Sequence, residues 1–381
     1  MSLFNPQIIT KRKKFVPGNK VYLSLSSEGL GHSSRGLAIA REFQKDEIVM
    51  GTYNYALKRL TDNGYNCVAL PQELELIGTK GSFDVRKTII KNHTWALTFN
   101  NIINEEMEAI RQHNAGCVVA DGRLTPVMAA DRLGLPCIVI TNQSAFYPFF
   151  EKDTALIRVF GKSFDWIMKT WLSSAEEILI PDFPPPHTIS IYNLSKNFRV
   201  MKRTRFVGPL VSFDTDELKA AERPADKYIV VALGGHAYRR PLLDTIIEAA
   251  RQLKDYYFDV FANFDVPNLP DNVIVHQSVP TILHYLKAAD IVITQGGHST
   301  AMELMTLGKP SIIIPDYKQI EQENNALRMH ELKTSIRIEK PDFTPERVIE
   351  TIKMIMSDSV YLEKAQYYSR LAREIQGRKR A

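Results

Sequence analysis

The sequence predicts an α/β protein made of two doubly wound, Rossmann-like domains. The chain has 381 residues, more than one hydrophobic core usually holds. In both halves, short runs that are apolar throughout alternate with helical patterns, as expected of parallel strands covered by helices on both faces. The first strand pattern of each half ends in a glycine loop that begins a helix.

The first half shows this order twice. We expect a strand at 20–26, the loop Glu28-Gly29-Leu30-Gly31-His32 and a helix at 33–43. A second unit has a strand at 117–120 that ends at Asp121-Gly122, a helix at 126–133 and a strand at 136–141.

The second half repeats the order. A strand at 227–233 leads into Gly234-Gly235 and a helix at 242–253, and further strands are expected at 258–262, 273–276, 290–294 and 311–314. A polar stretch with Gly and Pro separates the halves. The predicted domains are residues 18–208 and 225–358, and a last helix at 361–376 is expected to pack across either of them.

Composition narrows the class of protein. Hydrophobic residues make up 44% and charged residues 24% of the chain, and the net charge of +5 is concentrated in two basic tails. We find no basic stripe interleaved with aromatics, which argues against nucleic acid. Three scattered cysteines favour a reducing compartment, and no apolar run is long enough to span a membrane. We therefore expect a cytoplasmic protein, either free or peripheral at a membrane.

The first glycine loop holds a candidate general base. Gly29 and Gly31 leave backbone N–H groups open at a helix start, and His32 follows them. Asp121 ends a later parallel strand and should open toward the same sheet edge, where it would orient His32 as a base. The alternative is that His32 only bonds the loop backbone and that Asp121 only forms a turn with Gly122.

The second half holds the stronger motif, Thr294 to Glu303, followed by a strand and a loop. Glycines with hydroxyl side chains at a helix start form an anion site suited to a diphosphate, and Gly234-Gly235 form a second one. One helical turn on, Glu303 would accept the ribose hydroxyls, while Glu321 and Gln322 would face a sugar. The candidate anion-site residues of the motif are Gln295, Gly296, Gly297, His298, Ser299 and Thr300.

These motifs resemble the glycosyltransferases that include the bacterial lipid II N-acetylglucosaminyltransferase and the UDP-glycosyltransferases. The resemblance is carried by residues 228–327, by Gly29 to Arg35 and by 118–121. It implies the GT-B fold, with a nucleotide sugar, favoured as UDP-linked, in the second domain and the acceptor in the first. The chain departs from the family at Gln295, where a phosphate-binding histidine is common, and His298 either replaces that donor or only caps the helix.

We expect neither a metal nor a cofactor. Asp214 and Asp216 form an Asp-x-Asp pair, but they precede an expected helix, where Asp is an ordinary cap. Helix starts can carry the charge of a diphosphate without a cation. Retaining relatives carry a second glutamate eight positions beyond the first, and this chain has Ser311 there, so the resemblance implies inversion.

The acceptor is the least defined part of the prediction. Aromatic residues at 146–171 form a helical stripe, which is either core or a surface for a lipid or a membrane. The acceptor is expected to be lipid-linked or a small molecule. Two other functions stay open at this point, a nucleotide-sugar epimerase and a non-catalytic subunit that binds a nucleotide sugar.

Overall fold

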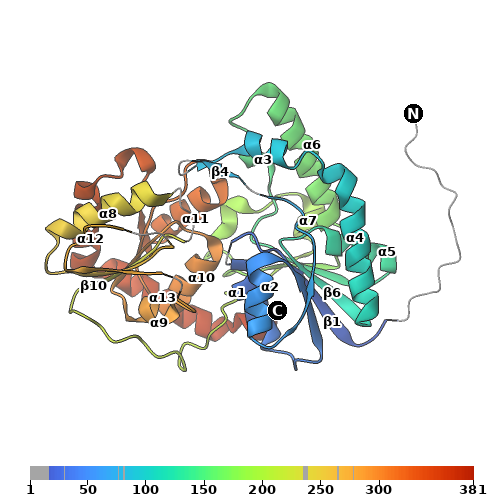
Figure 1. The fold of residues 1–381 in the computed structure, drawn as a ribbon, viewed down its shortest axis with the longest axis horizontal. Helices are drawn as coiled ribbons and strands as arrows, with labels where there is room; N and C mark the ends of the chain where they lie inside the picture. The colour runs from blue at the N-terminus through green and yellow to red at the C-terminus, as the bar shows by residue number, and fades with distance from the viewer. Residues whose placement is uncertain are drawn as a thin grey trace, which may run out of the picture.

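The protein consists of two parallel sheets with helices packed on them (Figure 1). The structure is a computed structural model that describes residues 17–29, 31–75, 77–79, 82–234, 239–263, 266–277 and 279–381. Figure 1 shows two lobes side by side, one from the blue-to-green half of the chain and one from the yellow-to-red half. The prediction of two doubly wound α/β domains is confirmed.

The first sheet has the strand order β3-β2-β1-β6-β7-β8-β9, and every neighbouring pair is parallel. Its strands are β1 (Lys20–Leu25), β2 (Ile48–Thr52), β3 (Asn66–Ala69), β6 (Ala115–Asp121), β7 (Cys137–Ile140), β8 (Glu177–Ile180) and β9 (Thr204–Phe206). The other elements of this half are α1 (Gly31–Ala40), α2 (Asn54–Asp62), β4 (Gly78–Thr79), β5 (Ser82–Phe83), α3 (Val85–Lys91), α4 (Trp95–Gln112), α5 (Thr125–Leu133), η1 (Tyr147–Phe149), α6 (Ala155–Leu172), η2 (Ser190–Asn193) and α7 (Phe198–Met201).

The second sheet has the order β12-β11-β10-β13-β14-β15 and is also parallel. Its strands are β10 (Tyr228–Ala232), β11 (Tyr257–Phe261), β12 (Val273–His276), β13 (Ile291–Thr294), β14 (Ser311–Ile313) and β15 (Ser335–Arg337). The other elements are α8 (Arg240–Gln252), α9 (Leu283–Ala288), α10 (His298–Leu307), α11 (Ile320–Glu331), η4 (Lys340–Asp342), α12 (Pro345–Ser357), α13 (Ser359–Ile375) and α14 (Gly377–Arg380).

Strand β10 shows why these strands are apolar at every position. Ile229 and Val231 belong to one buried hydrophobic cluster, while Tyr228 and Val230 belong to another. Successive side chains of a strand point to opposite faces, so the two clusters lie on opposite faces of the sheet. Both faces are therefore buried, as in a sheet with helices on each side.

Each sheet reverses its strand order next to its first strand. In the first sheet β1 lies between β2 and β6, and in the second β10 lies between β11 and β13. Loops that leave such neighbouring strands in opposite directions open a crevice at the carboxyl edge of the sheet, where ligands of doubly wound folds bind. His32 follows β1 and Asp121 ends β6, while Gly234 and Gln295 follow β10 and β13.

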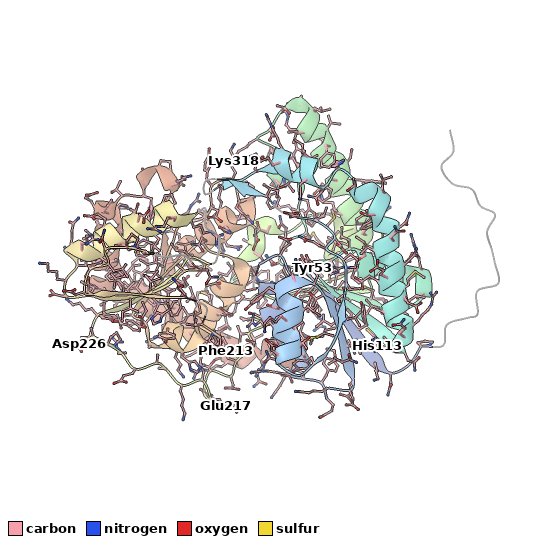
Figure 2. The ribbon with its side chains drawn as sticks, viewed as in Figure 1. Tyr53, His113, Phe213, Glu217, Asp226 and Lys318 are labelled. Carbon is pink, nitrogen blue, oxygen red and sulfur yellow. The ribbon has the colours of Figure 1, made fainter. Side chains whose placement is uncertain are left out.

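The end of the chain contacts both lobes. Ser369 of α13 donates to the Thr306 carbonyl of α10 in the second domain. Arg378 of α14 pairs with Glu42 of the first domain, and Figure 1 shows the C-terminus beside that lobe. The two domains are joined a second time by the connection at 207–227, on which Phe213, Glu217 and Asp226 are labelled in Figure 2.

The expected helix after Asp214 is not formed. Residues 215–217 make a single turn, in which Asp214 accepts from the Asp216 N–H at 2.9 Å. The stretch that follows is irregular down to β10 and holds Pro224, which disfavours continuation of a helix. Asp214 therefore stabilises a turn and is not a helix cap.

Candidate active site

One large cleft of about 2710 Å³ is lined by residues of both domains. Almost all described candidate residues line it, and the exceptions are Asp121 and Gly296, which lie behind its wall. Gly235 lies outside the described residues. The candidates on the cleft wall are Gly29, Gly31, His32, Gly234, Gln295, Gly297, His298, Ser299, Thr300, Glu303, Glu321 and Gln322.

His32 and Asp121 meet as predicted from their strands. The Nδ1 atom of His32 lies 2.8 Å from Oδ1 of Asp121, and Leu25 and Asp121 are register partners in the parallel pair β1 and β6. Asp121 is fully buried, whereas His32 is partly open to the cleft. A buried carboxylate that fixes one ring nitrogen leaves the other for chemistry.

Glycines make this approach possible. A side chain on Gly122 would place its Cβ 2.4 Å from the His32 ring, and Gly122 has a φ of +70°. A Cβ on Gly31 would lie 2.4 Å from Oγ of Ser299, a residue of the other domain. The first loop therefore needs glycine both for the histidine and for close contact with α10.

Arg35 joins this pair, although it was not among the predicted site residues. Its Nε and Nη2 atoms donate to the two carboxylate oxygens of Asp121, at 3.0 and 2.6 Å. Its Nη1 atom donates to Oγ of Ser299 at 3.3 Å. Burial alone would raise the pKa of Asp121, but the charges of Arg35 and His32 and their hydrogen bonds hold that pKa well below its usual range.

The start of α10, where the sequence predicts an anion site, is open toward the cleft. Gly296 has a φ of +81°, and a Cβ on Gly297 would meet nothing within 4 Å, so space is open in front of the helix start. Among the described residues, Nε2 of Gln295 and Nδ1 of His298 are buried and have no hydrogen-bond partner. Buried polar nitrogens without partners are rare, and these two line the cleft, which points to a polar ligand at this position.

His298 does not cap α10 with its side chain. Its Nε2 atom lies 3.2 Å from Oδ2 of Asp182, which is fully buried and also accepts from the Ser190 backbone N–H and hydroxyl. Asp182 belongs to the first domain, so this contact ties the start of α10 to the loop after β8. Of the two roles predicted for His298, the side-chain cap is wrong.

Glu303 lies half-buried one helical turn into α10. Burial raises its pKa to about 7, and the charge of Arg59 on α2 offsets this only in part. Arg59 itself donates to the hydroxyls of Ser33 and Ser34 on α1. Glu303 thus lines the cleft within reach of the charge of Arg59 from the first domain.

Glu321 and Gln322 begin α11, but they point to different partners. Oε1 of Glu321 accepts from Nδ2 of Asn142, which follows β7 in the first domain, at 2.9 Å. Oε1 of Gln322 accepts from the Asp316 backbone N–H at 2.9 Å. Glu321 therefore spans the cleft, whereas Gln322 holds the loop that precedes α11.

The aromatic stripe at 146–171 serves two surfaces. Phe146, Phe150, Phe160 and Phe164 pack edge-on or stacked with centroids 5.8 to 6.2 Å apart, and all four line the cleft. The outer face of α6 carries large exposed apolar side chains. These are Leu156, Val159, Phe160 and Trp166, with exposed fractions of 81%, 64%, 45% and 68%.

The described residues contain neither a helix able to cross a membrane nor a cluster able to hold a metal ion. No helix in the described ranges combines the length and apolarity needed to cross a bilayer. In the same part of the chain, no group of His, Cys, Asp and Glu side chains has the arrangement of a metal site.

Comparison with known proteins identifies the family. Residues 250–376 match the model of the family described as "glycosyltransferase family 28 C-terminal domain". An uncharacterized glycosyltransferase of Methanosarcina acetivorans is 30% identical over 368 residues, which are 94% of this chain and 96% of that protein. A UDP-N-acetylglucosamine--N-acetylmuramyl-(pentapeptide) pyrophosphoryl-undecaprenol N-acetylglucosamine transferase of Bacillus cereus is 24% identical, with coverage of 87% and 89%.

Solved structures agree on the fold. The glycotransferase of kitacinnamycin superposes with a TM-score of 0.72 at 20% identity and covers 96% of this chain and 97% of its own. Phytolacca americana UGT2, solved with UDP-2fluoro-glucose and pterostilbene, gives a TM-score of 0.68 at 14% identity, with coverage of 93% and 94%. Together with its two facing domains, these similarities show that the chain belongs to the glycosyltransferases of the GT-B fold.

Proposed function

We propose that this glycosyltransferase transfers a hexose from a UDP-sugar to an acceptor hydroxyl with inversion and without a metal ion. The observation that carries the proposal is the position of the His32–Asp121 pair directly opposite the start of α10, where Arg35 reaches Ser299 at 3.3 Å. A base in one domain thus faces an anion site in the other. The UDP-linked donor is supported by the relatives, whose names include a UDP-N-acetylglucosamine-dependent transferase.

The donor would lie along α10 and α11. Its diphosphate would occupy the open space before Gly297, where the helix dipole and backbone N–H groups favour negative charge. Gln295 Nε2 would donate to a phosphate oxygen, and the His298 ring, held by Asp182, lies beside it. Glu303 would accept the ribose hydroxyls. Glu321 would face the sugar, and Gln322, whose side-chain oxygen also holds the loop before α11, would line the same part of the cleft.

The reaction needs one proton transfer. Nε2 of His32 takes the proton of the acceptor hydroxyl while the oxygen attacks the anomeric carbon. The bond from that carbon to the diphosphate breaks as the new C–O bond forms, and the nucleoside diphosphate leaves with its electron pair. Asp121 stabilises the imidazolium that results, and the helix start holds the leaving charge in place of a cation. Attack from the opposite side inverts the anomeric centre.

The acceptor is proposed to be apolar at one end and lipid-linked. The aromatic side chains that line the first-domain part of the cleft would pack against it. The exposed apolar face of α6, flanked by Arg158 and Lys162, would bring this part of the cleft to a membrane surface. A small aromatic acceptor would use the cleft without the outer face of α6.

A donor screen tests the proposal. Thermal stabilisation is measured with UDP, other nucleotides and UDP-sugars, since a ligand at about 100 times its Kd adds roughly 2.7 kcal/mol. The best UDP-sugar is then incubated with acceptors in chelator, and NMR gives the anomeric configuration of the product. Retention, or activity only with a divalent ion, would refute the proposed mechanism. The relatives favour neither an epimerase nor a non-catalytic binding subunit. Conversion of the UDP-sugar in the absence of an acceptor would instead indicate an epimerase.

A further inference from the structure

Three atoms around the candidate base form a close triangle. Nδ1 of His32 lies 2.8 Å from Oδ1 of Asp121, and Nη2 of Arg35 lies 2.6 Å from that oxygen and 2.8 Å from Nδ1. All three distances are those of hydrogen bonds. Arg35 is only 4% exposed, so water does not separate these groups.

A neutral imidazole carries one N–H proton, and no placement of that proton on the His32 ring satisfies all three contacts. Arginine has donors and no acceptor, so a bond between Nη2 and Nδ1 requires Nδ1 to be unprotonated. A bond between Nδ1 and the Asp121 carboxylate requires the opposite, because an ionised carboxylate only accepts. Two arrangements therefore compete. In the first, Arg35 donates to Nδ1 and the ring proton sits on Nε2; in the second, Nδ1 donates to Asp121 and Nε2 is free.

Only the second arrangement makes His32 a base toward the cleft. The first places a proton on Nε2, the nitrogen that must accept the proton of the hydroxyl. The position of Arg35 decides between the two. Its Nε bond to Oδ2 of Asp121, at 3.0 Å, is compatible with either, so the outer guanidinium nitrogens can shift while Nε keeps the pair together.

The other end of Arg35 reaches the donor site. Its Nη1 atom donates to Oγ of Ser299 at 3.3 Å, at the start of α10, and the charge of Glu321 also acts on it. A diphosphate bound in front of Ser299 and Thr300 would bring two or more negative charges to this side of the guanidinium. Charge-assisted bonds to phosphate are stronger than a bond to a neutral ring nitrogen. A bound diphosphate would therefore pull the guanidinium toward Ser299 through Nη1 and lengthen the contact between Nη2 and Nδ1, while Nε keeps its bond to Asp121.

We infer that Arg35 is a positioning residue that couples occupancy of the diphosphate site to the tautomer of His32. Without a nucleotide the ring is held with its proton on Nε2. With a diphosphate in place, the proton moves to Nδ1, facing Asp121, and Nε2 is free to accept a proton. The inference rests on the proposed function, since it requires a diphosphate at the start of α10.

The test is ¹⁵N NMR of the imidazole nitrogens, with the His32 signals assigned by their loss in His32→Gln. Spectra are recorded at several alkaline pH values, so that the neutral forms of the ring are compared in both states. Protonated and unprotonated ring nitrogens resonate far apart. We expect Nε2 to be the protonated nitrogen in the free protein and Nδ1 in the presence of saturating UDP.

Two variants sharpen the test. Arg35→Lys keeps a positive charge near Asp121 but loses the fork that reaches Nδ1 and Ser299, so its His32 should carry the proton on Nδ1 with and without UDP. Arg59→Lys changes another first-domain arginine that lies near α10 but does not bond His32 or Asp121, and the UDP-driven change should persist.

The outcomes are distinct. If UDP binds and the His32 tautomer is the same in both states of the wild-type protein, the coupling is refuted while the proposed function stands. If UDP does not bind at all, the donor site fails and the inference fails with it. A poorly folded Arg35→Lys variant leaves the wild-type titration as a complete test.

Discussion

Asn142 of the first domain donates a hydrogen bond of 2.9 Å to Glu321 of the second, directly across the cleft. Glu321 is the residue proposed to face the transferred sugar, and Asn325 also donates to the same oxygen, at 3.3 Å. The proposed sugar site therefore draws on both domains, and its geometry depends on their relative position.

Substitution of Asn142 tests this relationship. Asn142→Ala should leave UDP affinity unchanged and weaken binding or turnover of the UDP-sugar by roughly 10-fold, the effect of losing one hydrogen bond to a charged group. Competition binding with UDP and with UDP-sugar separates the two. Asn100→Ala on α4, where the side chain accepts only from the exposed Arg132, is the matched control. Equal losses for UDP and UDP-sugar would contradict a role at the sugar.

The base should control turnover and not donor affinity. We expect His32→Ala to lose about 100-fold to 10,000-fold in rate with UDP affinity nearly unchanged, the range typical of general-base removal. Asp121→Asn should fall in the same direction, because the amide no longer stabilises the imidazolium. Single-turnover kinetics with saturating donor isolate the chemical step. A His32→Ala enzyme that transfers at the wild-type rate would eliminate this assignment.

The raised pKa of Glu303 predicts that the affinity for the donor depends on pH. Its pKa of about 7 in the free protein means that the carboxylate loses its charge as pH falls through neutrality. Ribose hydroxyls donate more strongly to the ionised form, so UDP affinity should rise between about pH 6 and 8 and level off above. Glu303→Gln should bind weakly and show no such rise. Calorimetry should also detect proton release on binding near pH 6.5, as linkage requires.

The ionised carboxylate of Glu303 should also lower the free energy of unfolding at high pH. A carboxyl whose pKa is higher in the folded than in the unfolded state favours folding below its unfolded value and loses that benefit as pH rises through the folded value. The neutral Glu303→Gln variant should therefore be more stable than the wild type at about pH 8, by roughly 2 to 3 kcal/mol, and similar to it at about pH 4. Denaturant unfolding at both values measures the difference. A variant less stable at pH 8 would show that the carboxylate is held by partners.

Much of the site followed from strand order, since residues after neighbouring parallel strands must meet at one sheet edge. That logic brought His32 to Asp121 and located the start of α10. Arg35 lay within the quoted motif, yet its role depends on contacts with Asp121 and with Ser299 of the other domain. Such contacts depend on the angle between domains, which local patterns do not encode. The contact between Asn142 and Glu321 could not be predicted for the same reason.

Several of the strands that the pattern did not predict are short ones with polar residues. β3, β9 and β15 lie at sheet edges and carry Asn66, Arg205 and Arg337, so they lack a continuous apolar run. An edge strand is covered less completely than a central one, and its sequence is correspondingly mixed. For the aromatic stripe the sequence predicted the helix but not which of its side chains are buried. Helical spacing identified α6 correctly, but only packing reveals that Met168 and Leu172 face inward while Trp166 faces out.

The outer face of α6 should bind to the surface of a membrane. Leu156 and Trp166 lie on that face with exposed fractions of 81% and 68%, and burial of such a side chain in an interface contributes about 1.5 to 3 kcal/mol. Leu156→Ser and Trp166→Ser should each weaken binding to anionic phospholipid vesicles by roughly 10-fold or more in a sedimentation assay. Met354→Ser removes an exposed apolar side chain from α12 in the other domain and should bind like the wild type.

Activity provides the second readout for α6. Both substitutions should slow transfer to a lipid-linked acceptor in vesicles while leaving transfer to a short-chain, water-soluble acceptor unchanged, because neither side chain lines the cleft. A membrane role predicts this separation, whereas damage to the cleft would slow both reactions together. If vesicle binding of the wild-type protein is no stronger than that of Trp166→Ser, the exposed face does not contact lipid. The aromatic cleft would then be the binding site of a soluble acceptor.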